Sequence, residues 1–325
     1  MEEYVPEDLN WRDYSLTGPD AGDSFAPNQW YSSPVPRKRM KQLMKRRNGP
    51  ALINYGFWLA LVALTGFWLV QSWGTPWAIA ALFFYGIFYG SCADSRWHET
   101  SHGTVFKTPW LNQFFYQLAS FMALKNPYLW RWSHTRHHTD TVVVGRDPEI
   151  AFPRPPSLWG MVLNLLQLRA GVAELKKMVR LSFGLLTDDQ KSFLIEADRS
   201  KTFRASRIHL AILVTTGIWA IYAQSWLPVL LIGTPTFYGS WLHHILASTQ
   251  HAGLAEDIPD HRMNSRTVCM NPFFRFVYSN MNYHVEHHMY PMVPFYSLPA
   301  LHQEIRGDCP PAYRSTLAAY RDMIP

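Results

Sequence analysis

Two long stretches without a charged side chain constrain the fold of this chain more than any other feature. Residues 51–92 and residues 208–252 contain no Asp, Glu, Lys or Arg. As one helix, residues 51–92 would be about 63 Å long at 1.5 Å per residue. The hydrocarbon core of a bilayer is only ~30 Å thick. Each stretch is therefore predicted to cross a membrane twice, as a helical hairpin.

Helix-breaking residues place the turns of these hairpins. Gly74 and Pro76 predict a turn at residues 72–76, and a second turn is expected near residues 223–228. The apolar stretch 111–124 is too short to span and is predicted to lie in the interface or to re-enter. Amphipathic surface helices are expected over residues 154–207. The four spans are predicted at residues 52–70, 77–92, 208–222 and 227–248.

Basic residues predict the orientation of the spans. Seven Lys and Arg residues fall within residues 37–47, directly before the first span, and the two turns contain none. By the positive-inside rule, both termini and the segments between the hairpins of this integral membrane protein are predicted to be cytoplasmic. A net charge of +6 would also suit nucleic acid, but a basic run that flanks a span is a topology signal. No nucleic-acid partner is expected.

The predicted fold class is an all-α membrane protein. Four transmembrane helices form two hairpins, and a cytoplasmic helical cap carries the candidate site described next. The expected organisation is a cytoplasmic N-terminal extension with its basic run, a membrane domain and a cytoplasmic C-terminal tail. These parts are predicted at residues 1–50, 51–308 and 309–325.

Most of the 14 histidines fall into three short clusters on the predicted cytoplasmic side. Residues spaced by three or four share one face of a helix, so each cluster can direct at least two imidazoles to the same point. The first cluster follows the second span directly, and the third comes after the fourth span. The clusters are His98 and His102; His134, His137 and His138; and His284, His287 and His288.

Eight clustered imidazoles predict a metal centre. Neutral imidazole suits zinc, copper, iron and nickel rather than magnesium or calcium. A structural zinc takes four ligands, usually including Cys, and eight histidines exceed the capacity of one ion, so two ions are expected. The isolated His209, His261 and His302 are interpreted as ordinary core or surface residues. Candidates to accept the outer N–H of a ligand histidine are Asp94, Glu99, Asp140, Asp147 and Glu286.

Two function classes that bind metal in membranes are alternatives to consider for these histidine clusters. A metal transporter would place its ligands along a path at the middle of the membrane, whereas these histidines gather at one face. A membrane zinc hydrolase would need an open zinc and a carboxylate general base, and eight histidines are too many for it. The bound metal distinguishes these classes, because one zinc would indicate the hydrolase and only loosely held metal would indicate the transporter.

The three clusters resemble the histidine boxes of the membrane fatty-acid desaturases and hydroxylases. The order and spacing of the boxes and the intervening pair of spans are similar, over roughly residues 50–305. Residues 145–149, 280–294 and 298–302 are close to that family as well. The resemblance implies two iron ions, O2 activation and attack on an unactivated C–H bond by hydroxylation, desaturation or oxidative demethylation. Because imidazole binds both metals, zinc could take the place of iron in a purified sample. No catalytic residue beyond the metal ligands is expected.

The resemblance also implies one more histidine ligand before the third box. His251 lies at a depth that matches His98, so it is the predicted ninth ligand, with His243 and His244 as alternatives. The chain is similar to bacterial members that act with a separate ferredoxin, including the rhizopine-catabolism oxygenase type, and this resemblance implies the bacterial inner membrane as its location. A ferredoxin or another small acidic electron donor, O2 and a lipid or small organic substrate are therefore the implied partners.

Overall fold

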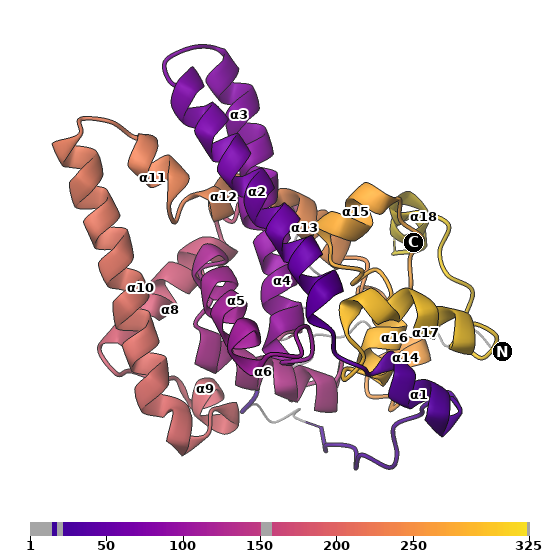
Figure 1. Ribbon diagram of the computed structural model, residues 1–325. Helices are drawn as coiled ribbons and strands as arrows, with labels where there is room; N and C mark the ends of the chain where they lie inside the picture. The colour runs from indigo at the N-terminus through magenta and orange to yellow at the C-terminus, as the bar shows by residue number, and fades with distance from the viewer. Residues whose placement is uncertain (1–14, 18–21, 151–157, 324–325) are drawn as a thin grey trace.

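The computed structural model describes residues 15–17, 22–150 and 158–323, and regular structure in these ranges is helical (Figure 1). Two isolated bridges, Thr267 to Tyr283 and Val268 to Tyr313, are the only β pairing in this part of the chain. The prediction of an all-α protein is confirmed. Residues 1–14 and 18–21 of the predicted N-terminal extension and residues 154–157 of the predicted surface helices lie outside the described residues.

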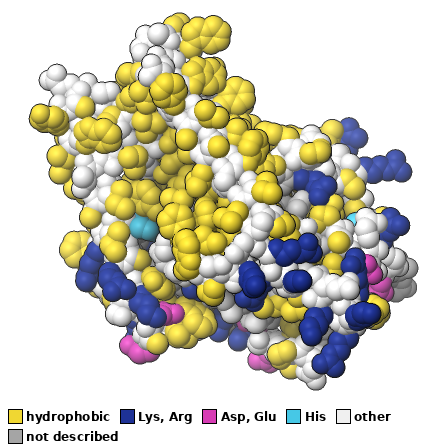
Figure 2. Space-filling view, in the orientation of Figure 1, with side chains coloured by type: hydrophobic (Ala, Val, Ile, Leu, Met, Phe, Trp, Pro, Cys, Tyr) yellow, Lys and Arg dark blue, Asp and Glu magenta, His cyan; other side chains and the backbone are white. Residues whose placement is uncertain are grey.

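Within these ranges, three helices are long and apolar enough to cross a membrane. The first, Arg37–Ser72, includes α2 (Asn48–Ser72). The second is the continuous helix Trp77–Ser101, which α2 joins through a turn with Gly74 at φ 82°. The third is α10 (Glu196–Tyr222). The hairpin that α2 forms with the second helix projects above the other helices in Figure 1. In Figure 2 hydrophobic side chains cover this hairpin, and Lys and Arg side chains gather below it. Large exposed apolar side chains on α2, such as Ile53 and Phe67, suit lipid rather than water.

The second helix contains a π-helical turn directly before its histidines. It consists of α3 (Trp77–Gly86), η1 (Ile87–Ser91) and α4 (Cys92–Ser101). At this turn the backbone lies against Gly239, where an added Cβ would meet the Gly86 carbonyl oxygen at 2.0 Å. Small residues permit such close helix contact in membranes. The contact fixes α4 relative to the last apolar segment.

The segment of the predicted fourth span, residues 227–248, does not form one continuous helix. Three short helices replace it, and Pro228 and Pro235 open the first two of them. Gly233 lies between them at φ 85° and packs so tightly that a Cβ would lie 2.2 Å from Leu213. Proline removes a backbone donor and interrupts a helix, and irregular backbone at membrane depth is tolerated where protein buries it. The three helices are α11 (Leu227–Leu231), α12 (Pro235–Gly239) and α13 (Trp241–Ala247).

Shorter helices lie below the first hairpin and beside α10 (Figure 1). The short apolar stretch near residue 111 forms α5 (Pro109–Met122), which packs on α4. Helices also occupy residues 158–193, within the region where surface helices are expected. The remaining helices are α1 (Arg37–Leu43), α6 (Pro127–Thr139), α7 (Leu158–Leu165), α8 (Ala170–Ser182), α9 (Asp188–Phe193), α14 (His261–Asn264), α15 (Pro272–Val277), α16 (His284–Met289), η2 (Phe295–Ser297), α17 (Leu298–Ile305) and α18 (Thr316–Met323).

Candidate metal centre

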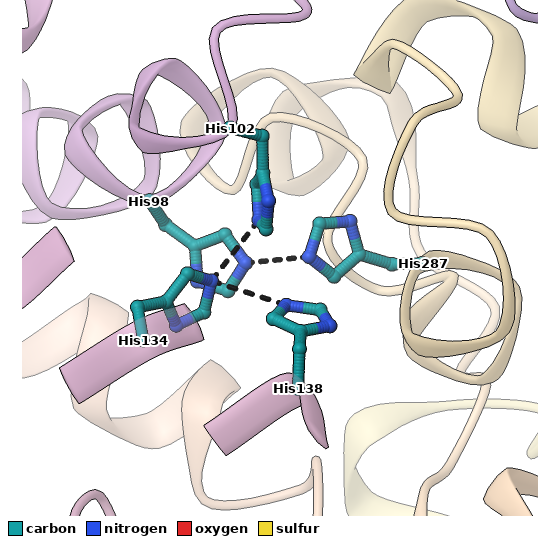
Figure 3. Close-up of side chains that lie close together, drawn as sticks. All are labelled: His98, His102, His134, His138 and His287. Atoms are coloured by element: carbon teal, nitrogen blue, oxygen red, sulfur yellow. Dashed lines mark hydrogen bonds between the residues drawn. The ribbon is translucent and has the colours of Figure 1, made fainter. Parts of the chain in front are cut away.

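Nine histidines from four segments converge into two groups. In each group, the candidate ligand atoms all lie within 4.8 Å of one another. The first group is drawn in Figure 3 and includes two half-buried rings, His102 and His138, whereas every ring of the second group is buried. The first group comprises His98, His102, His134, His138 and His287, and the second comprises His137, His251, His284 and His288.

Two helices with the same His-x-x-His-His spacing contribute to the groups in opposite ways. On α6, His134 and His138 face the first group and His137 faces the second. On α16, His284 and His288 face the second group and His287 faces the first. In both helices the i, i+4 pair stays together because these positions share one face. The i+3 residue points to the neighbouring group.

The two groups lie side by side. The ring of His138 stacks on that of His288 with 4.3 Å between the centroids, and the rings of His284 and His287 are 5.8 Å apart. Each of these contacts joins a member of one group to a member of the other. Two ions held by these groups would therefore be close neighbours.

Ring nitrogens within each group are closely spaced. In the first group, Nε2 of His98 is 2.7 Å from Nε2 of His287, and Nε2 of His102 is 3.0 Å from that of His134. In the second, Nε2 of His284 is 2.8 Å from that of His251 and 3.0 Å from that of His288. Ligand nitrogens about 2.0–2.1 Å from a shared ion would have comparable separations.

The outer nitrogens of four of these rings are held by polar partners. His137 Nδ1 lies 2.8 Å from Asp147 and His134 Nδ1 lies 3.1 Å from Glu149. His251 Nδ1 donates to the carbonyl oxygen of Asn264 at 2.7 Å, and His288 Nδ1 lies 3.1 Å from the Thr141 hydroxyl. A carbonyl or carboxylate partner fixes the proton on Nδ1. The Nε2 lone pair is then free to face an ion.

Electrostatics keep most of these imidazoles uncharged. Burial, and then the neighbouring rings, hold the pKa values of His138, His284 and His288 well below their usual range. At His137 burial lowers the pKa, but the Asp147 carboxylate outweighs it and raises the pKa to about 8. For Glu149, burial is outweighed by His134, which lowers the pKa to about 2. Neutral imidazoles backed by anionic carboxylates are the state that a metal ion requires.

Of the five acidic residues predicted as acceptors, only Asp147 lies within hydrogen-bond distance of the outer nitrogen of a clustered histidine. Asp94 pairs with Lys125 at 2.7 Å, and Asp140 lies near Arg136 and Arg146. Glu99 is 3.8 Å from His287 Nδ1, beyond hydrogen-bond distance. Glu286 contacts His302 and Thr267 instead. Glu149, the partner of His134, was not among the predicted acceptors. The only signal for it in the sequence was its position at the end of residues 145–149, which resemble the membrane desaturases and hydroxylases.

The five histidines other than these nine lie outside both groups. His251 joins the second group, whereas His244 Nε2 lies 2.5 Å from the Gln167 amide and His243 lies 3.6 Å from Asp94. His209 of α10 packs against Phe121 of α5, as an ordinary core residue would. His302 and His261 each contact the site, because His302 bonds to Glu286 of α16 and His261 packs on His288.

The donor set fits two ions of the kind that imidazole binds. The groups supply five and four ring nitrogens, largely buried and neutral, with outer partners that orient them. A family model described as fatty acid desaturase matches residues 73–319, well over half of the chain and all nine histidines. No curated protein matches the sequence.

Proposed function

The chain belongs to the fatty acid desaturase family, and on that basis we propose that it is an O2-dependent diiron oxygenase of the membrane. Membership makes it an oxidoreductase and an integral membrane protein. The proposed reaction is attack on an unactivated C–H bond of a lipid or small organic substrate, by hydroxylation, desaturation or oxidative demethylation. The observation that carries the proposal is the pair of adjoining histidine groups.

The nine histidines of these groups are the proposed metal ligands, five for one ion and four for the other. Two irons bound there would activate O2, which supplies the oxidising equivalents, for attack on a strong C–H bond. The protein's contribution is orientation and exclusion of water. Asp147, Glu149 and the Asn264 carbonyl fix ring orientations, and burial of the second group keeps solvent from a reactive centre.

Electron balance implies a donor. Hydroxylation converts C–H and O2, with two electrons and two protons, to C–OH and water. Desaturation uses the same electrons and protons and forms a double bond and two waters. A ferredoxin or another small acidic protein is the proposed source of the electrons.

The same contacts argue against a zinc hydrolase that uses Asp147 or Glu149 as its general base. A hydrolase would need a carboxylate free to activate water. Asp147 instead accepts from His137 and from the backbone N–H of Val142 and of Glu149, all within 2.9 Å. Glu149 is held by His134. Both carboxylates are engaged in orienting ligands.

Product analysis after turnover is the direct test of this function. The purified protein would be loaded with iron, reconstituted with a ferredoxin and its reductase, and supplied with O2 and a panel of fatty-acyl and small methylated substrates. A hydroxylated, unsaturated or demethylated product that depends on O2 and electrons supports the proposal. O2-independent hydrolysis products would contradict it.

We also propose four membrane crossings with both termini and the metal site on the cytoplasmic side, the fourth crossing being the broken segment α11–α13. Single cysteines introduced near Gly74 and near Gln224 are expected to react with an impermeant thiol reagent added from outside. These turns join consecutive spans and carry no basic residue. Labelling of a cysteine at Ser200 in intact cells would show that the orientation is wrong.

Electrostatic docking of the donor makes turnover sensitive to salt. The basic run over residues 37–47 is largely exposed, and complementary charge accelerates association with an acidic partner. Raising ionic strength is expected to slow donor-dependent reduction by roughly tenfold or more. Charge reversal of Lys38 and Lys41 should weaken that dependence, with reversal of Lys201 as the control. Reduction that ignores salt in the wild type would contradict electrostatic docking.

A further inference from the structure

A non-helical segment near the N-terminus, residues 22–35, contacts the elements that surround the second histidine group. The backbone N–H of Gly22 donates to the Val144 carbonyl at 3.0 Å, and that of Tyr31 donates to the Pro259 carbonyl at 2.9 Å. The backbone N–H of Ser33 donates to the sulfur of Met289 at 3.1 Å. These contacts fall after α6, before α14 and at the end of α16. The segment therefore ties together three parts of the chain that flank the second group.

Trp30 of this segment approaches the second group through His261. Its ring stacks on the buried ring of His261 with 4.4 Å between centroids and 14° between planes. The His261 ring in turn lies 5.2 Å from that of His288. Three rings in succession thus connect the half-buried Trp30 to a histidine of the second group.

The helix under Trp30 holds two histidines of the second group. α14 begins at His261 and ends at Asn264. The Asn264 carbonyl accepts from His251 Nδ1, and the Asn264 amide donates to the Thr141 carbonyl at 3.3 Å. The hydroxyl of Thr141 faces His288 Nδ1. A shift of α14 would therefore disturb His251 directly. It would also disturb His288, through Thr141 and through the ring of His261.

The segment is itself fastened to α14. The guanidinium of Arg262 lies 3.4 Å from the centre of the Tyr31 ring, and it also pairs with Asp260 at 2.7 Å. Trp30 and Tyr31 thereby cover adjacent residues of the same short helix. A helix of four residues has little stability of its own, so packing from outside is what fixes its position.

We propose that Trp30 is a positioning residue, and that residues 22–35 clamp α14 and thereby retain the metal ion of the second group. The inference rests on the proposed function only in that the second group holds an ion. The first group, with half-buried His102 and His138, should exchange its ion more readily. The two ions are therefore expected to differ in their rate of release.

Release of metal to a chelator tests the proposal without any measurement of activity. The wild-type protein loaded with two ions is expected to lose them to a chromogenic chelator in a fast and a slow phase. Trp30→Ala should accelerate the slow phase by roughly tenfold or more, the range seen when partners of metal ligands are lost, and leave the fast phase unchanged. Trp30→Phe, which keeps a ring over His261, should restore slow release. His251→Ala should lack the slow phase and so identify it.

The matched control is Trp110→Ala, which removes an exposed tryptophan from α5 and should change neither phase. Equal acceleration of both phases in Trp30→Ala would indicate general loosening and would overturn the inference. A slow phase that Trp30→Ala does not alter, or release of both wild-type ions in one phase, would also overturn it while leaving the proposed function intact. A wild-type protein that binds no metal would overturn the proposed function as well.

Discussion

Replacing both His137 and His138 by alanine is expected to remove the ions of both groups and abolish turnover. The two residues are neighbours in sequence, but His137 faces the second group and His138 faces the first. Each group therefore loses one ligand. Loss of an outer partner alone weakens metal binding by about 10- to 100-fold, and loss of a ligand should cost more. Metal content after gel filtration, measured by elemental analysis, reports the result.

A buried histidine outside both groups provides the control for this double variant. His209 lies on α10 and contacts Phe121 rather than another histidine of the site. His209→Ala should retain both ions, which shows that loss of a buried imidazole is not by itself enough to empty the site. A His137→Ala, His138→Ala chain that stays fully metallated would contradict the assignment of these residues as ligands.

The second large effect is expected from His251→Ala, which should lose the ion of the second group and nearly all activity while keeping the first ion. His251 Nε2 lies 2.8 Å from that of His284, and its Nδ1 is held by the Asn264 carbonyl. The second group has only four histidines, so one loss leaves three. His244→Ala, which removes a ring bonded to Gln167, should keep both ions.

Iron content and turnover of these two single variants separate the alternatives. One iron per chain in His251→Ala and two in His244→Ala are expected. The reverse result would assign the ninth ligand to His244. Retention of both ions and full activity in both variants would remove either histidine from the site.

The spacing of the clustered histidines predicted that their side chains converge, but it did not predict how they divide between the two groups. Positions i and i+4 share a face of a helix, whereas position i+3 is turned by about 60° from i and about 100° from i+4 at 3.6 residues per turn. That offset is small enough to keep His137 beside His138 and large enough to direct it to another group. Only the placement of α6 opposite α16 determines which group each ring meets.

The broken fourth helix shows a different limit of sequence interpretation. Hydropathy identified an uncharged stretch long enough to span, but it did not weigh Gly233 and Pro235 inside that stretch. Those residues are ordinary breakers. They are accommodated because Gly239 packs on the backbone of Gly86, a tertiary contact between residues more than a hundred positions apart.

The outer partners of the histidines show the same limit. Asp147 was a candidate partner by proximity in sequence, whereas the Asn264 carbonyl that holds His251 has no sequence signature.

The most direct test of the proposed diiron centre is the iron stoichiometry and spectrum of the wild-type protein. The full chain would be produced in medium enriched in 57Fe, purified in detergent or nanodiscs, and examined by elemental analysis and Mössbauer spectroscopy. Two irons per chain, with signals from two nitrogen-rich sites that disappear in the His137→Ala, His138→Ala variant, are expected. A folded protein that binds a single metal ion per chain, or whose iron signals persist in that variant, would contradict a diiron centre at these histidines.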